Sequence, residues 1–115
     1  MRDWTSIRDR YLRDGLPTRL GGLAANLGRI RSFALQNAGA EVVGGLIDES
    51  KRFIEWTAAE ADVKVAAELV ELQIELAGWE RNLQQVMDDP EHRGRVASRA
   101  ERWSERVLEM SGLLG

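Results

Sequence analysis

The sequence contains no cysteine, a single histidine and only two prolines among its 115 residues. Without cysteine the chain can form no disulfide, carry no thiol nucleophile and offer no thiolate to a metal ion. His92 stands alone, so both the HExxH zinc motif and the Glu-x-x-His pairs of di-iron bundles are missing. These absences exclude several classes of chemistry, and we expect no metal site, no cofactor and no catalytic residue.

Long hydrophobic runs are also missing. No uncharged stretch approaches the roughly 18 residues that a membrane-spanning helix requires, and the first ten residues lack the apolar core of a signal peptide. A hydrophobic content of 43% and a charged content of 30% are ordinary for a soluble protein. A chain of this length suits one hydrophobic core rather than two. The sequence therefore predicts a single domain, residues 1–115, that is cytoplasmic and makes no membrane contact.

The strongest pattern lies in residues 57–87. One apolar set alternates steps of four and three, which places it on one side of a helix: Val65, Leu69, Leu72, Leu76, Trp79, Leu83 and Val86. A second set falls on nearly the opposite side: Val63, Ala67, Val70, Ile74 and Ala77. A helix that is apolar on two sides requires cover on both, so we expect this helix in the middle of a bundle, opened by a capping box of Thr57 and Glu60.

A strand is the alternative for part of this stretch, because residues 70–76 also alternate apolar with polar side chains. The flanks are rich in Ala, Glu, Leu and Gln, which are strong helix formers, and they favour the helix.

Start and stop signals divide the rest of the chain into helices. Asp3 is placed to cap a short first helix that ends at Gly15, and Pro17 favours a new start near Thr18. The remaining signals are Asn37 and Gly39 as a stop, Ala40 as a start, Asp89–Pro90 as a start and Gly112 as a stop. Short connections make successive helices antiparallel neighbours. The predicted fold class is all-α: an antiparallel up-down helical bundle of four main helices plus a short N-terminal helix.

Charge is segregated along the chain, although the net charge is only −3. Residues 1–31 hold seven arginines against three aspartates, and residues 92–115 hold five arginines against three glutamates. The intervening residues 32–91 hold thirteen carboxylates against four basic side chains. Basic ends around an acidic middle favour complementary packing of helices; a basic recognition surface is the alternative.

The central carboxylates suggest one enzymatic alternative. Helical nucleotide pyrophosphohydrolases bind Mg²⁺ through Glu-x-x-Glu on one helix and Glu-x-x-Asp on another. Glu68–Leu69–Val70–Glu71 fits the first half, and Glu75 lies one turn further on. No Glu-x-x-Asp follows, and these acids share the polar strip of the predicted helix. We expect a solvated face, with a Mg-dependent nucleotide-hydrolysing enzyme as the alternative.

Arginine-rich N-terminal helices give the third alternative, nucleic-acid binding. The residues concerned are Arg8, Arg10, Arg13, Arg19, Arg29 and Arg31. Acidic residues at positions 3, 9 and 14 dilute this patch, and no helix-turn-helix spacing is recognisable.

Two further residues are candidates for a partner surface besides Arg8 and Arg13. Arg31 falls within an apolar sector, so its guanidinium must reach water or a carboxylate; we expect a structural ion pair, with a partner contact as the alternative. Trp56 precedes the predicted cap at Thr57, where it can pack toward Ala61 as a hydrophobic staple. An exposed docking aromatic is the alternative for Trp56.

Three segments together resemble a family of small, uncharacterised all-helical proteins from cyanobacteria. They are RDWTSIRDRYLRDGLPTRLGGLAANLGRI (Arg2–Ile30), ESKRFIEWTAAEA (Glu49–Ala61) and RVLEMSGLLG (Arg106–Gly115). The resemblance implies a cytoplasmic protein of unknown role and carries no functional residue over to this chain.

The sequence as a whole favours a non-enzymatic protein–protein interaction or structural module. Four tryptophans are many for a chain of this size, and those that the core cannot hold would form part of a helical contact face. We therefore expect a protein partner or a homo-oligomer, with self-association through helix faces.

Overall fold

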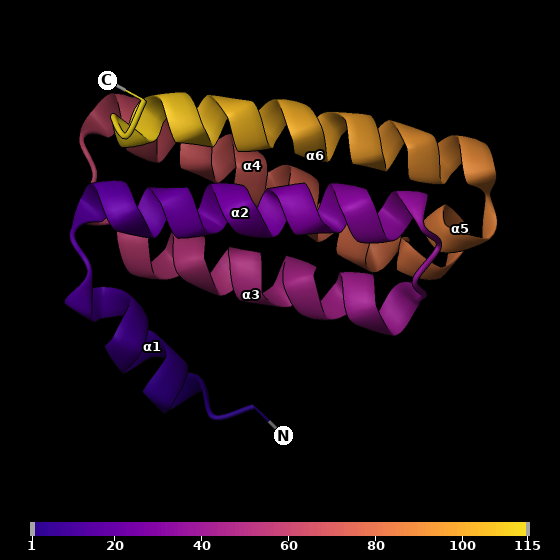
Figure 1. Cartoon of the computed structure of the whole chain (residues 1–115), viewed down its shortest axis with the longest axis horizontal. Coiled ribbons are helices and arrows are strands. Elements are labelled where there is room, and N and C mark those ends of the chain that lie inside the picture. Colours follow the sequence, from indigo (N-terminus) through magenta and orange to yellow (C-terminus); the bar gives the residue numbers. More distant parts are fainter. Residues whose placement is uncertain (1, 115) are drawn as a thin grey trace.

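The structure, a computed structural model, describes residues 2–114, and every regular element in that range is an α-helix (Figure 1). The prediction of an all-α protein is therefore confirmed. The helices are α1 (Trp4–Arg13), α2 (Leu16–Leu35), α3 (Ala40–Ala58), α4 (Val63–Arg81), α5 (Leu83–Asp88) and α6 (Pro90–Ser111).

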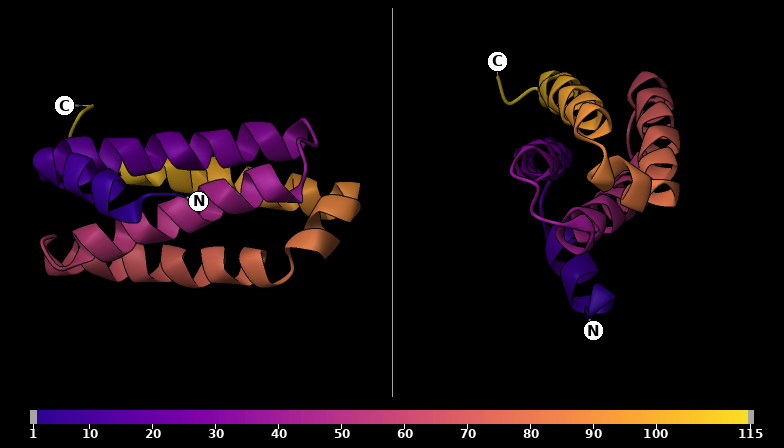
Figure 2. Two further views of the ribbon diagram at one scale, coloured as in Figure 1. Left: turned by 90° about the horizontal axis from the view of Figure 1, so that it is seen from below. Right: turned by 90° about the vertical axis from the view of Figure 1, so that its right-hand side faces the viewer.

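The core is built around α2, which packs most extensively against α6 and also against α3. Its inward residues include Leu23, Leu27 and Ile30, none of which has any exposed surface. The end-on view in Figure 2 places α2 and α4 on opposite sides of the molecule, with α3 and α6 between them. The prediction that residues 57–87 form a helix in the middle of the molecule is wrong, because α4 lies at one side and its outward residues, such as Val63 and Ile74, are exposed.

Most of the predicted helix ends are confirmed, because each rests on a local backbone requirement. The Asp3 carboxylate accepts the backbone N–H of Ser6, and the Asp89 carboxylate accepts that of Glu91. The left-handed conformations favoured at helix ends occur at Asn37, with φ 52°, and at Gly112, with φ 76°. Pro17 lies in the first turn of α2.

The boundary predicted at Thr57 is wrong. Thr57 lies inside α3 and is fully buried, and its hydroxyl oxygen lies 3.1 Å from the hydroxyl of Tyr11. The cap is Asp62, whose carboxylate accepts the backbone N–H of Val65 at 2.9 Å. The Thr57 hydroxyl is buried in the core and hydrogen-bonds to Tyr11, so it does not cap the next helix.

The helix predicted over residues 57–87 is also interrupted, at Asn82, which separates α4 from α5. Asn82 has φ −110° and its side-chain amide donates to the carbonyl of Gly78. Leu83, the first residue of α5, approaches the surface of α3 closely: a Cβ on Gly44 would lie 2.9 Å from its methyl Cδ2. The break therefore turns α5 toward α3.

The short helix α1 leans away from the other helices and contacts α3 through aromatic side chains (Figure 1). Tyr11 stacks on Phe53 with ring centroids 4.1 Å apart, and Trp4 meets Trp56 edge to face at 6.3 Å. The guanidinium of Arg52 lies 4.5 Å from the centroid of Trp4. The staple predicted for Trp56 is therefore wrong, because Trp56 lies within α3 and packs in this aromatic cluster.

Ion pairs join the basic ends of the sequence to its acidic middle. The pairs are Arg2–Glu49, Arg19–Glu60, Arg99–Glu75 and Arg106–Glu68. The prediction that charge segregation reflects complementary packing is thereby confirmed. Among residues 2–114, no helix combines the length and the apolar character needed to cross a bilayer.

Candidate interaction surface

The outward face of α4 carries large apolar side chains in contact with water. Val63 is 85% exposed, Val70 53% and Ile74 67%. On the opposite face of the same helix, Leu72 and Leu76 have no exposed surface. We call the outward set, Val63, Ala67, Val70, Ile74 and Ala77, the α4 stripe. The prediction that both apolar sides of this helix are covered is wrong.

The arrangement of neighbours explains why the α4 stripe is uncovered. α4 packs against α3, α5 and α6, and the end-on view shows all three on its inner side (Figure 2). A helix at the outside of such an arrangement needs one apolar face, and α4 has two. The second face is therefore left for a partner outside this chain or for water.

Ion pairs fix the sides of α4 next to the stripe. Glu75 accepts from Nε and Nη2 of Arg99, both at 2.8 Å, and from the indole of Trp103 at 3.0 Å. Glu68 accepts two hydrogen bonds from Arg106 at 2.6 and 2.5 Å, and Glu80 accepts one from Lys51 at 2.8 Å. Long side chains thus connect α4 to α6 and α3 and hold the outward face in a fixed orientation.

These contacts also set the protonation of the two glutamates that α6 binds. Hydrogen bonds from Arg106 hold the pKa of Glu68 below its ordinary value against the opposing effect of burial. Hydrogen bonds from Arg99 do the same for the pKa of Glu75, with a smaller contribution from Trp103. Both carboxylates are therefore ionised at neutral pH and engaged with guanidinium groups.

That engagement bears on the magnesium alternative. Of the three acids that suggested it, Glu68 and Glu75 are held by arginines and only Glu71 is free in water. Among residues 2–114, no three acidic or histidine side chains converge as a metal site would require. An ion bound by these acids would have to displace two bidentate arginine contacts.

Arg31 forms the ion pair predicted for it: its Nε lies 3.2 Å from a carboxylate oxygen of Glu101 on α6. The side chain is 42% exposed, so it reaches the surface as well as a partner. Arg8 and Arg13 lie exposed on α1. Trp56 is half-buried among the aromatic side chains that join α1 to α3.

The six arginines of the nucleic-acid alternative do not form one free patch. Arg19 is 8% exposed and donates to Glu60 and to the backbone carbonyls of Asp14 and Leu12. Arg29 donates to the side chain of Asn26, and Arg31 pairs with Glu101. The exposed cations left on α1 are Arg8, Arg10 and Arg13.

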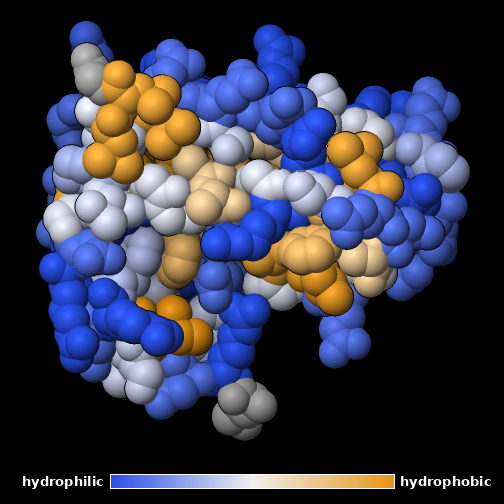
Figure 3. Space-filling view, in the orientation of Figure 1, coloured by the Kyte–Doolittle hydropathy of each residue, from blue (hydrophilic) through white to orange (hydrophobic). Residues whose placement is uncertain are grey.

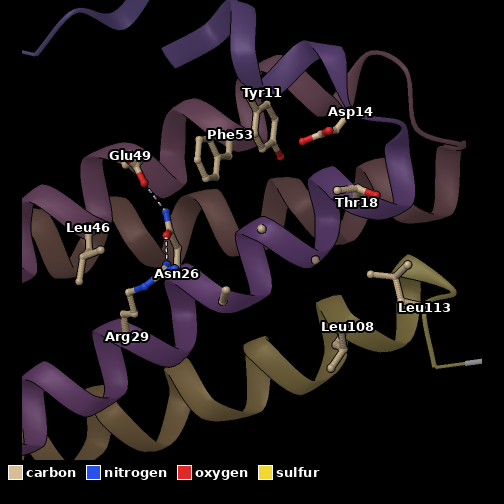
Figure 4. Close-up of a pocket in the computed structure, with 13 residues that line it drawn as sticks. Tyr11, Asp14, Thr18, Asn26, Arg29, Leu46, Glu49, Phe53, Leu108 and Leu113 are labelled. Atoms are coloured by element: carbon tan, nitrogen blue, oxygen red, sulfur yellow. Dashed lines mark hydrogen bonds between the residues drawn. The ribbon is translucent and has the colours of Figure 1, made fainter. Parts of the chain in front are cut away.

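A shallow groove of about 730 Å³ lies between α1, α2 and α3 and reaches the end of α6 (Figure 4). Its floor is apolar and includes Gly21, where a Cβ would lie 2.8 Å from Leu113. Its polar side chains bind one another: Asn26 donates to Glu49 at 2.9 Å and accepts from Arg29 at 2.5 Å. On this face hydrophobic residues gather near the C-terminal end of α6 and in further groups toward the opposite end of the molecule, with hydrophilic residues between them (Figure 3). We assign no ligand to the groove.

Comparisons with protein-family models, with curated proteins and with solved structures find no match to this chain. Function must therefore be inferred from the surface itself.

Sequence reasoning identified every residue of the α4 stripe and assigned the stripe to the core. The spacing of Val63, Val70 and Ile74 shows that they share a face, but it does not say whether another helix covers that face. A sequence signal for the exposure was nevertheless available. Each long helix needs one buried face, and among the predicted helices only this one has a second, opposite apolar face, which can be left without a neighbouring helix.

Proposed function

We propose that this chain is a non-enzymatic interaction module that self-associates through the α4 stripe. The observation that carries the proposal is the exposure of Val63, Val70 and Ile74 along one face of a helix whose other face is buried. Single exposed apolar residues are ordinary on protein surfaces, whereas three aligned on one helix form a continuous contact strip.

The energetic argument favours a partner that also presents a helix. Fully burying a valine or isoleucine side chain contributes about 1.5–3 kcal/mol. Three partly exposed side chains on each of two copies supply a driving force that the entropy cost of association reduces. Ala67 and Ala77 within the stripe are small, so a second helix can approach α4 closely. A second copy of α4 has the matching shape and hydrophobicity.

We further propose that the four long helices constitute the antiparallel up-down bundle that the sequence predicts. The short connections between α2 and α3 and between α3 and α4 support this arrangement. We also place the protein in the cytoplasm, which the absence of cysteine supports. The resemblance to small cyanobacterial proteins carries no functional residue and contributes nothing to these proposals.

The test is light scattering of the purified chain beside two variants. Ile74→Glu introduces a charge at the centre of the stripe, and we expect it to weaken self-association by at least about tenfold without unfolding the protein. Leu35→Glu is the matched control, because Leu35 is 54% exposed on α2 and lies outside the stripe. It should associate as the natural chain does. Equal association of all three proteins would refute the α4 stripe as the contact surface.

A further inference from the structure

Two charges of opposite sign flank the α4 stripe on the same side. Lys64 and Glu71 are seven residues apart, and both are exposed. Other carboxylates of α4 are paired within the chain, whereas among residues 2–114 neither Lys64 nor Glu71 takes part in an ion pair. This flank therefore presents an unused positive charge and an unused negative charge beside an uncovered apolar strip.

The stripe has the spacing of a coiled-coil seam. Its members follow steps of four, three, four and three, so Val63, Val70 and Ala77 occupy one class of core position and Ala67 and Ile74 the other. Lys64 and Glu71 then occupy equivalent flanking positions in successive heptads. In an antiparallel pair of helices, flanking positions of this kind face their counterparts on the other helix.

We propose that two copies of the chain pair antiparallel through α4, with Lys64 of each copy bound to the partner's Glu71. This inference rests on the proposed self-association and adds its orientation and register. The register that brings these charges together also places Val63 against the partner's Ile74 and Ala67 against the partner's Val70. Large side chains then meet across the outer layers, and one alanine in each central layer allows the backbones to approach.

Charge excludes the neighbouring registers. Sliding one helix by a heptad in one direction places Glu71 against the partner's Glu71, and sliding it in the other places Lys64 against the partner's Lys64. In a parallel pair, Lys64 and the partner's Glu71 are separated by seven residues, or about 10 Å along the axis. The antiparallel register is thus the one in which both charges are neutralised twice.

The interface uses one face of one helix, which is at the lower end of interface sizes. We therefore expect a reversible dimer with a dissociation constant on the order of micromolar. Lys64 and Glu71 would contribute orientation more than affinity, as charges at the rim of an interface generally do.

Introduced cysteines test the orientation, because the natural chain has none. In the proposed dimer a cysteine at position 63 faces position 74 of the other copy. Two copies of position 63 are about 16 Å apart along the axis, beyond the roughly 7 Å that a disulfide can span. Mixing Val63→Cys with Ile74→Cys under mild oxidation should therefore give the mixed disulfide in excess over either symmetric one. Leu35→Cys, outside the stripe, should not cross-link. Dominant symmetric disulfides at position 63 would overturn the antiparallel orientation.

Charge reversal tests the ion pairs. Lys64→Glu and Glu71→Lys each place like charges together twice, and each should raise the dissociation constant about tenfold. The double variant Lys64→Glu/Glu71→Lys restores opposite charges in both places and should return the constant to within about twofold of the natural value. A double variant as weak as the single ones would overturn the ion pairs and the register while leaving self-association intact. A natural chain that is monomeric throughout would overturn the proposed function as well.

Discussion

Tyr11 is the residue that ties three helices together. Its ring stacks on Phe53 of α3, and its hydroxyl donates to the backbone carbonyl of Arg19 in α2 at 2.9 Å. The Thr57 hydroxyl, also in α3, lies 3.1 Å from the Tyr11 hydroxyl oxygen and can donate to it. Burial raises the pKa of Tyr11 to about 12, although the hydrogen bond from Thr57 opposes the shift. The attachment of α1 therefore depends on a neutral phenol.

Tyr11→Phe should lower the free energy of unfolding by about 1–2 kcal/mol, because it keeps the stacked ring but removes the hydrogen bonds that the buried Tyr11 hydroxyl makes to the Arg19 carbonyl and to the Thr57 hydroxyl. Urea denaturation at neutral pH measures the difference, and circular dichroism should show unchanged helix content. An unchanged stability would mean that water satisfies these groups.

The same residue predicts how stability responds to alkali. The pKa of Tyr11 is higher in the folded chain than the value of about 10 expected in the unfolded chain, so folding favours the neutral phenol. Its contribution is complete below pH 10 and is lost as the pH rises toward 12, by about 2–3 kcal/mol. Because this is the only tyrosine, ultraviolet absorbance of tyrosinate reports its titration directly. A midpoint near 10 in the folded protein would refute its burial.

Glu75 predicts the opposite response, toward acid. Its folded-state pKa lies below the unfolded value of about 4.3, so its contribution is complete above that pH and is lost as the pH falls through the folded value. Glu75→Gln should lower stability by about 1 kcal/mol at pH 7 and by progressively less under acid. Glu55→Gln, at an exposed position of α3, is the matched control and should have little effect. Parallel acid profiles for both variants and the natural chain would contradict the role of the Arg99 contact.

At the scale of the element, one face of α4 is buried in the core and the opposite face is exposed. Leu72→Asp should unfold the chain, because Leu72 has no exposed surface and the new carboxylate would be buried without a partner. Val70→Asp, two residues earlier on the outward face, should keep the free energy of unfolding within about 0.5 kcal/mol of the natural value. Urea denaturation of dilute samples, where the chain is monomeric, separates the two outcomes.

If both aspartate variants unfold, the outward face is covered after all, and the α4 stripe cannot be a free surface. If both remain folded, α4 is not held by the core. Either result would contradict the placement of α4.

Helix ends were predictable where the requirement is local. Asp89 followed by Pro90 specifies a helix start from two residues, and Gly112 specifies a stop through its left-handed backbone. Thr57 failed because its hydroxyl has a partner in Tyr11, 46 residues away in sequence. A capping motif indicates which hydrogen bond a side chain can make locally. Here the Thr57 hydroxyl makes a tertiary hydrogen bond to Tyr11 instead.

The candidate surface was predictable in composition but not in exposure. The periodicity of Val70 and Ile74 depends on their own helix, whereas their exposure depends on where α3, α5 and α6 pack. Sequence periodicity carries no information on the second point. The ion pair of Arg31 was predictable because an arginine in an apolar sector has few other options, although its partner Glu101 was not.

At the scale of the molecule, charge layout and helix packing agree. Arginines of the two ends meet carboxylates of the middle in pairs that join α6 to α4 and α2 to the turn after α3. Exposed pairs of this kind contribute little stability each, but they fix which sides of the helices face one another. These pairs orient α4 so that the α4 stripe faces outward.

Self-association through that face is tested most directly by sedimentation equilibrium of the natural chain over a wide range of concentrations. We predict an apparent mass that rises from the 12.9 kDa of one chain toward twice that value, with a midpoint on the order of micromolar. A mass that stays at 12.9 kDa up to concentrations on the order of a millimolar would contradict the account.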